Sequence, residues 1–216
     1  MPKVTDAYLE AKKEQILEAA AACFAKNGFH QTTMQDICRE AKLSAGAVYR
    51  YFSGKEEIIE TIVEGGRRYS EAIIQTARAL PETHQVLNHL ADNFFAFLDN
   101  PDSQTAIRTE INIASEALRD PRVLDMVRLG FDMVRTSFAD IVGEAQKRGD
   151  MTSTLDPDAV ARVLISLYRG LMYQKAIDPN VDVKKYVAVV KSLKFVEPDN
   201  VDETPKAARK PERSRR

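Results

Sequence analysis

Apolar residues recur at helical spacing along most of this sequence, and no stretch alternates apolar and polar residues over the length of a strand. In residues 10–27, for example, Ile16, Ala20, Cys23 and Phe24 stand at i, i+4, i+7 and i+8 on a core-facing stripe. The spacing predicts about nine helices, at residues 10–27, 33–41, 44–52, 53–80, 84–98, 103–118, 121–148, 157–177 and 183–195. We therefore expect an all-α fold.

Residues with strong capping preferences mark several of these boundaries. Gly28 follows the first helix and suits the left-handed conformation that ends many helices. Thr33 with Asp36, and the segment Ser53–Glu56, have the spacing of capping boxes, in which two residues satisfy each other's backbone N–H groups. Ser44 is expected to cap the short helix that follows it. The sequence therefore predicts two short helices joined by a tight turn in this region.

The chain has 216 residues, 44% of them hydrophobic and 29% charged, which is typical of a globular protein. No run approaches the roughly 18 apolar residues of a membrane span, and no secretory signal is visible, so we expect a cytoplasmic protein without membrane contact. Residues 1–55 and 56–196 are the expected domains, and the polar, basic segment 197–216 is expected to be disordered. The net charge is +2 for residues 1–55, −8 for 56–203 and +5 for 204–216, so contacts with a polyanion are expected at the two ends.

The sequence carries no recognisable catalytic or cofactor motif. It has no phosphate-binding loop, dinucleotide fingerprint, nucleophile elbow or zinc-protease motif. His84 and His89 lie about 140° apart around a helix, so they cannot share one metal-binding face. Cys23 and Cys38 stand on predicted buried faces as apolar fillers, and two cysteines cannot build a disulfide framework or a zinc site. We expect a protein that is not an enzyme and needs no metal or cofactor.

The predicted pair of short helices has the pattern of a helix-turn-helix, and its second helix carries side chains suited to DNA. The small segment Ala45-Gly46-Ala47 lets the backbone approach a groove closely, while Val48 and Phe52 face inward. The segment Tyr49-Arg50-Tyr51 is expected to face outward between these anchors. Arginine reads guanine through two hydrogen bonds, and tyrosine hydroxyls bond phosphate oxygens. Lys55 follows at the start of the next helix, where free backbone N–H groups favour an anion.

One stretch closely resembles the N-terminal DNA-binding domain of the TetR/AcrR family of transcriptional regulators: ILEAAAACFAKNGFHQTTMQDICREAKLSAGAVYRYFSGKEEII. The match covers about residues 12–63 and joins several independent pieces at fixed spacing. The resemblance implies an N-terminal three-helix domain followed by a helical bundle that binds a ligand and forms a dimer. It also implies phosphate-contact positions at Thr33, Tyr49 and Lys55, and positions facing bases at Gln35, Ala45, Gly46 and Arg50.

A ligand pocket in the C-terminal bundle needs apolar walls and a few converging polar groups. Seven residues on the predicted helices between 84 and 148 are candidates on this ground. They are Phe94, Phe97, Arg108, Ile111, Asn112, Met126 and Phe131. The walls favour an apolar or aromatic small molecule. The alternative is that the aromatic residues are ordinary core and the charged residues form a solvated face.

The last two predicted helices are the expected dimer interface. Residues 157–177 carry an apolar seam on which Gly170 permits close approach, and residues 183–195 carry a second seam. The seam residues are Val160, Leu164, Leu167 and Leu171, then Tyr186, Val189, Val190 and Leu193. A dimer is expected because one recognition helix reads only a few base pairs, and two half-sites lie at least one helical turn apart. The alternative is that both seams pack within the subunit.

Together with the resemblance, these observations predict a cytoplasmic homodimer that binds a double-stranded DNA operator, as a repressor released by a small apolar or aromatic effector. The effector would tilt the helix at 53–80, in which Gly65-Gly66 is either a flexible point or a close-packing site. One alternative is a helical small-molecule-binding or enzymatic protein with a vestigial helix-turn-helix, which the absence of catalytic motifs disfavours. Another is a sequence-independent architectural DNA binder, which the near-neutral N-terminal segment and the acidic body disfavour.

Overall fold

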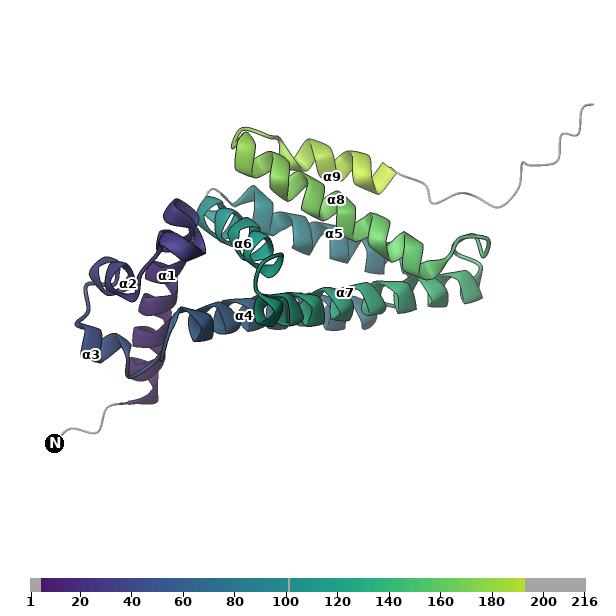
Figure 1. Ribbon diagram of the computed structural model, residues 1–216. Coiled ribbons are helices and arrows are strands. Elements are labelled where there is room, and N and C mark those ends of the chain that lie inside the picture. The colour runs from purple at the N-terminus through teal and green to yellow at the C-terminus, as the bar shows by residue number, and fades with distance from the viewer. Residues whose placement is uncertain (1–4, 101, 193–216) are drawn as a thin grey trace, which may run out of the picture.

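The computed structural model describes residues 5–100 and 102–192, and within these ranges the chain forms nine helices and no strand (Figure 1). The expected all-α fold is confirmed. The end of the last predicted helix and the segment expected to be disordered, 197–216, lie outside the described residues. The helices are α1 (Asp6–Gln31), α2 (Met34–Glu40), α3 (Ala45–Val48), α4 (Lys55–Arg78), α5 (Thr83–Asp99), α6 (Ser103–Ala117), α7 (Pro121–Arg148), α8 (Pro157–Ile177) and α9 (Val183–Ser192).

The long helix α1 and the short helices α2 and α3 gather at one end of an elongated molecule, and α4 leads from them into the rest of the chain (Figure 1). Helix α4 lies beside α7, α7 packs on α8, and α9 packs on α5. Helix α6 packs extensively on α1. The continuous helix α4 and the α1–α6 contact therefore both join the N-terminal unit to the C-terminal bundle.

Three polar side chains of α6 form hydrogen bonds or an ion pair with α1. Thr109, Asn112 and Glu116 stand at i, i+3 and i+7 and therefore share one helical face. Thr109 Oγ1 donates to a carbonyl of α1 at 2.9 Å, and Asn112 Nδ2 donates to the Phe24 carbonyl at 3.0 Å. Glu116 Oε2 lies 3.0 Å from His30 Nε2. Polar contacts thus fix the N-terminal unit against the bundle.

Side-chain caps form where the sequence predicts them at the start of α2 and α3. Asp36 N–H donates to Thr33 Oγ1 at 3.2 Å, and Thr33 N–H donates to Asp36 Oδ2 at 3.0 Å, which completes the capping box. Ser44 Oγ accepts from Ala47 N–H at 3.3 Å. Gly28 has a φ of +74° and interrupts the helical geometry near the end of α1, as its position predicts.

The predicted capping box from Ser53 to Glu56 is wrong by one residue. Helix α4 begins at Lys55, its N-cap is Gly54, and no side chain caps it. Ser53 donates instead to Glu57 Oε2, from its N–H at 2.7 Å and from its hydroxyl at 2.8 Å. These hydrogen bonds lower the pKa of the Glu57 carboxyl. The carboxylate that pairs with Ser53 is therefore the third helical residue counted from the true start.

The regular part of α3 is shorter than predicted. It ends at Val48, and the chain continues in turns, with the N–H groups of Tyr51 and Phe52 donating to Val48 O at 3.0 and 3.1 Å. Helix α1, by contrast, is longer than predicted and begins at Asp6, because Thr5 accepts a hydrogen bond from the first turn.

The core of the N-terminal unit extends into the C-terminal bundle. Phe24 of α1 and Ile37 of α2 belong to the same buried cluster as Ile113 and Ala117 of α6 and Val123 of α7. Helices α1–α3 therefore do not bury their apolar faces among themselves alone. The domain boundary expected after residue 55 remains a prediction, and the buried cluster crosses it.

Helix α4 is anchored in two different cores. Ile58 and Ile59, both 0% exposed, belong to the N-terminal core, whereas Ile73 and Ile74 belong to a core shared with α5, α7 and α8. Gly65-Gly66 lies between these anchors and is exposed, and a Cβ on either glycine would meet no atom within 4 Å. Within the subunit, the glycine pair is therefore not a close-packing site.

None of the helices within the described ranges is both long and apolar enough to cross a lipid bilayer. The same part of the chain holds no group of three or more His, Cys, Asp or Glu side chains that could bind a metal ion. Cys23 and Cys38 are free and buried, as expected for apolar fillers. Burial raises the pKa of the Cys23 thiol, and the nearby carboxylates of Glu40 and Asp36 add to this effect.

Candidate nucleic-acid interface

The turn between α2 and α3 is held by hydrogen bonds from both sides. Lys42 takes a left-handed conformation with a φ of 53°, and Leu43 N–H donates to Cys38 O at 3.0 Å. Gln15 of α1 donates from Nε2 to Ala41 O at 2.7 Å. Helix α1 therefore fixes the turn, and with it the angle between the two short helices. No sequence pattern predicts this role of Gln15, because its acceptor is a backbone atom 26 residues away.

The exposed face of α3 and the turn that follows it is built on two buried anchors. Val48 and Phe52 are 0% and 1% exposed, as their spacing predicts. Tyr49 is 53% exposed, and Arg50 beside it is exposed and forms no ion pair or hydrogen bond with the described part of the chain. Tyr51 is half-buried against the N-terminal core, so the prediction that it faces outward is wrong. Among residues 5–100 and 102–192, neither the Arg50 guanidinium nor the Tyr49 phenol has a hydrogen-bond partner, so both are available to a ligand outside the chain.

The remaining predicted contact residues before α4 are small or polar and lie at the surface. Ala45 and Gly46 are exposed, and a Cβ on Gly46 would meet no atom within 4 Å. Gln35 and Thr33 are exposed at the start of α2. The Thr33 hydroxyl donates to Asp36 Oδ2 at 2.6 Å, and this bond is the main cause that lowers the pKa of Asp36. To donate to a phosphate, the Thr33 hydroxyl would have to turn away from Asp36.

The ammonium of Lys55 is turned toward the chain itself. Its Nζ donates to Phe29 O at 2.8 Å and to Thr32 O at 2.6 Å, and it lies 4.4 Å from the centre of the Phe29 ring. Thr32 is 0% exposed. These contacts join residues 23 and 26 positions apart, so no local sequence pattern predicts them.

The seven candidate pocket residues do not gather in one place. Phe94 and Phe131 pack on the core that α4, α5, α7 and α8 share, whereas Phe97 and Ile111 pack on another core that includes α8 and α9. Asn112 faces the other way, since its side chain binds the α1 backbone. The candidate residues on α5 and α6 therefore lie in at least three different environments.

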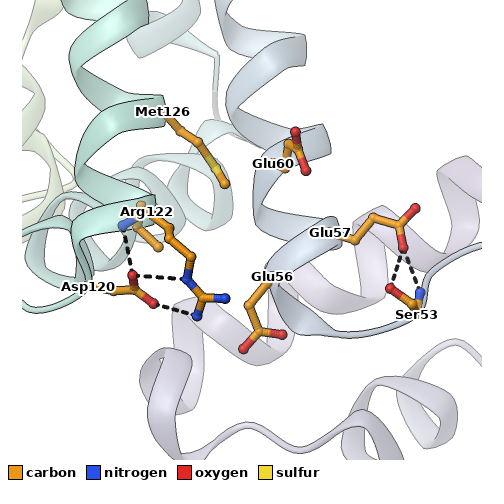
Figure 2. A pocket seen from close by; sticks show the side chains of 8 residues that line it. Ser53, Glu56, Glu57, Glu60, Asp120, Arg122 and Met126 are labelled. Carbon is orange, nitrogen blue, oxygen red and sulfur yellow. Dashed lines mark hydrogen bonds and ion pairs between the residues drawn. The ribbon is translucent and has the colours of Figure 1, made fainter.

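The last two candidates lie away from the bundle interior. Arg108 is exposed on α6. Met126 lines a surface cleft of about 370 Å³ between the start of α4 and the start of α7 (Figure 2). Figure 2 shows Arg122 paired with Asp120 on one wall, at 3.1 Å, and the carboxylates of α4 on the other. The cleft lining is Ser53, Glu56, Glu57, Glu60, Asp120, Arg122, Val123 and Met126, and its excess of carboxylates does not suit an anion.

An aromatic cluster lies where α5, α7 and α8 meet. The Tyr168 ring lies 6.0 Å from Phe94 and 5.8 Å from Phe95, and Phe94 lies edge-on to Phe138 at 5.8 Å. Burial raises the pKa of the Tyr168 phenol far above its usual range, and the nearby Glu110 carboxylate adds to the effect. Sequence periodicity does not single out Tyr168, because a lone aromatic residue beside an apolar helical seam has no distinctive spacing.

The predicted dimer seam on α8 is partly buried within the subunit. Val160 and Leu171 are only 6% and 0% exposed, so these two residues fill the subunit core. The exposed apolar residues of α8 are Val163 at 51%, Tyr173 at 59% and Ile177 at 69%. The outward apolar face of the helix is therefore rotated away from the predicted seam.

Comparison with known proteins identifies the family of both parts of the chain. Residues 16–62 match the sequence model of bacterial regulatory proteins of the tetR family. Residues 83–193, more than half of the chain, match the model of the C-terminal part of BetI-type transcriptional repressors. The HTH-type transcriptional regulator UidR of Escherichia coli K12 is 25% identical over 160 residues, which cover 74% of this chain and 79% of UidR.

Solved structures share the fold. FadR of Bacillus subtilis, in complex with stearoyl-CoA, aligns with a TM-score of 0.71 and 19% identity over 85% of this chain and 99% of FadR. SmeT, in complex with triclosan, aligns with a TM-score of 0.68 and 23% identity over 89% of this chain and 98% of SmeT. Both sequence models describe transcriptional regulators, and UidR is itself a transcriptional regulator and not an enzyme. The chain therefore belongs to the TetR family of transcriptional regulators.

Proposed function

We propose that this regulator is a cytoplasmic repressor that binds its operator as a homodimer and leaves it when a small apolar or aromatic molecule binds in the C-terminal bundle. The observation that carries the proposal is the free, exposed pair Tyr49 and Arg50 above the buried anchors Val48 and Phe52. The match to BetI-type repressors favours repression.

In this proposal the exposed side chains divide between bases and phosphates. Arg50 and Gln35 bond base edges in the major groove, where both side chains can make two hydrogen bonds to one base. The small pair Ala45-Gly46 lets the start of α3 approach the groove. Tyr49 and Thr33 bond phosphate oxygens, which fix the orientation of the protein on the duplex. Sequence discrimination then rests mainly on Arg50 and Gln35.

The effector site proposed here lies at the aromatic cluster around Tyr168. Phe94 and Phe131 supply apolar walls on the core next to it. The ion pair between Glu110 and Arg169 lies near the Tyr168 phenol and supplies the polar groups of the site. Stearoyl-CoA and triclosan, the ligands of the FadR and SmeT complexes, both contain a large apolar part, which supports an apolar effector.

The proposed dimer interface is the exposed apolar face of α8 together with α9. Val163, Tyr173 and Ile177 lie on α8 with the exposed Gly170 between them, and Val189 of α9 is 60% exposed. A contiguous apolar face is costly to leave in water, so a partner copy is its natural cover. Two-fold pairing places two copies of α3 on half-sites whose centres are about 34–36 Å apart, one turn of DNA.

A selection of genomic fragments with the purified protein tests the DNA-binding half of the proposal. On the selected fragment, Arg50→Ala is expected to cost roughly 1–3 kcal/mol and to relax the preference for one base. Tyr49→Phe is expected to weaken binding to selected and random duplexes alike. Arg128→Ala on the exposed surface of α7 serves as the charge-matched control. Equal losses on both duplexes for Arg50→Ala contradict its role in reading bases.

The effector half is tested by thermodynamic linkage. A ligand that releases the operator must weaken DNA binding by the same factor by which DNA weakens ligand binding. A thermal-shift screen of aromatic and acyl compounds supplies the ligand, and Tyr168→Phe is expected to reduce its affinity about tenfold or less, the effect of removing one hydrogen bond. A stabilising ligand that leaves DNA affinity unchanged contradicts the proposed switch.

A further inference from the structure

The ammonium of Lys55 holds together the two ends of the segment that contains α2 and α3. It donates to the carbonyls of Thr32 and Phe29 at 2.6 and 2.8 Å. Thr32 and Lys55 stand 23 residues apart, and the residues between them include the whole helix-turn-helix. The contact therefore closes the helix-turn-helix into a loop whose ends meet at one side chain.

Both ends of this loop are firmly anchored. Thr32 is 0% exposed, and its hydroxyl donates to Gly28 O at 2.8 Å. On the other side, Ile58 and Ile59 bury the beginning of α4 in the N-terminal core. Because the helix is broken at Gly28, the carbonyls that follow lack the N–H partners of a continuing helix. Lys55 supplies donors to two of these carbonyls.

We propose that Lys55 is a positioning residue that fixes α2 and α3 relative to α1 and α4, and that it is not a phosphate ligand. The proposal rests on DNA binding by this unit. A lysine ammonium has three donors, of which two are bound to carbonyls here, and the Phe29 ring covers a further side. Releasing Nζ to a phosphate would give up short, charge-assisted bonds. Closing the loop lowers the conformational freedom of the segment and keeps α3 in one orientation.

The salt dependence of DNA binding separates a positioning residue from a phosphate ligand. Removing one phosphate ligand from the protein makes the slope of log K against log salt concentration shallower by about 0.9. For Lys55→Met we expect binding to the selected fragment to weaken at least about tenfold, with binding to random duplex and both salt slopes unchanged. Lys26→Met, which removes an exposed lysine of α1, is the matched control and is expected to leave the preference for the selected fragment intact.

Two outcomes overturn the proposal. The first is an equal loss of affinity on both duplexes with a slope shallower by about 0.9 per subunit, which identifies a phosphate ligand. The second is a lower melting temperature with the preference for the selected fragment unchanged well below that temperature, which identifies a purely structural residue.

A measurement without DNA tests the same contact if the selection yields no operator. Hydrogen exchange of the backbone amides at residues 33–52 is expected to be roughly 10- to 100-fold faster in Lys55→Met than in the parent, because the variant lacks two hydrogen bonds from a charged donor. Lys26→Met is expected to exchange at parental rates. If Lys55→Met does not fold, Lys55→Gln replaces it, since its polar amide suits this half-buried place while the shorter, neutral side chain loses the charge-assisted bonds to both carbonyls. Parental protection of residues 33–52 in the folded variant overturns the proposal whether or not the protein binds DNA.

Discussion

The contact between His30 of α1 and Glu116 of α6 joins two side chains that are unequally buried. The His30 side chain is 60% exposed and that of Glu116 only 5%. Removing His30 leaves a buried carboxylate without the partner 3.0 Å away, whereas removing the charge of Glu116 leaves an imidazole that water solvates. The two substitutions are therefore expected to have very different effects on stability.

The magnitudes follow from this asymmetry. A buried polar group left without its partner costs about 1–3 kcal/mol, so we expect His30→Ala to destabilise the protein by about 2 kcal/mol. In a chain of this size that corresponds to a melting temperature lower by roughly 4–8 °C. Glu116→Gln keeps an acceptor for the imidazole and removes the buried charge, and we expect a change within about 0.5 kcal/mol.

The double variant decides whether the buried charge causes the destabilisation. Because Glu116→Gln removes the charge that His30→Ala strands, the double variant is expected to be more stable than His30→Ala alone by about 1 kcal/mol. The assay is urea denaturation at pH 7, monitored by far-ultraviolet circular dichroism. The control is His84→Ala, which removes an exposed histidine of α5. Equal destabilisation by the two single variants, or effects that simply add, refute the reasoning.

Three further predictions concern Gly28, the pair Gly65-Gly66 and Cys23. Gly28→Ala is expected to lower stability by about 1–3 kcal/mol in urea denaturation, since φ +74° with ψ 169° suits only glycine, and an unchanged midpoint contradicts this. Replacing Gly65-Gly66 by two alanines is expected to stabilise α4 by about 1–2 kcal/mol. The same change is expected to alter the release of DNA by the effector, while the affinity for DNA without effector stays the same. If binding titrations show that the effector releases DNA from the variant as it does from the parent, there is no hinge at these glycines. The raised pKa and burial of Cys23 predict that its thiol reacts with a disulfide reagent at pH 8 only as fast as the protein opens, and reaction within the mixing time contradicts this.

The sequence predicts best those features that depend on neighbours within one helical turn. The capping box of Thr33 and Asp36 and the cap at Ser44 form as expected, because each joins atoms at most four residues apart. The break at Gly28 also forms as expected, because it depends on the backbone freedom of that one residue. The spacing of Val48 and Phe52 likewise suffices to place both in the core. Strong local preferences and tertiary packing agree at these positions.

The features that the sequence does not predict depend on contacts between distant elements. The amide of Asn112 suits a pocket by its chemistry, and only the packing of α6 on α1 turns it to a backbone carbonyl. Lys55 is attracted to two carbonyls that exist as acceptors because α1 breaks nearby. The exposed face of α8 is displaced from its predicted seam because α8 contacts helices on several sides, and hydrophobicity alone does not tell which apolar stripe remains outside.

The shared core of the N-terminal unit changes what counts as an exchangeable module in this protein. A hybrid regulator joined after residue 55 would place a foreign helix-turn-helix against Ile113, Ala117 and Val123, three residues that belong to its core but are encoded far downstream. The polar groups of α6 that meet α1 would also face a new surface. Altered DNA specificity is therefore better obtained by grafting the exposed residues around Tyr49 and Arg50 than by exchanging the segment before α4. For recombination, the inherited unit is the helix-turn-helix together with the end of α6 and the start of α7.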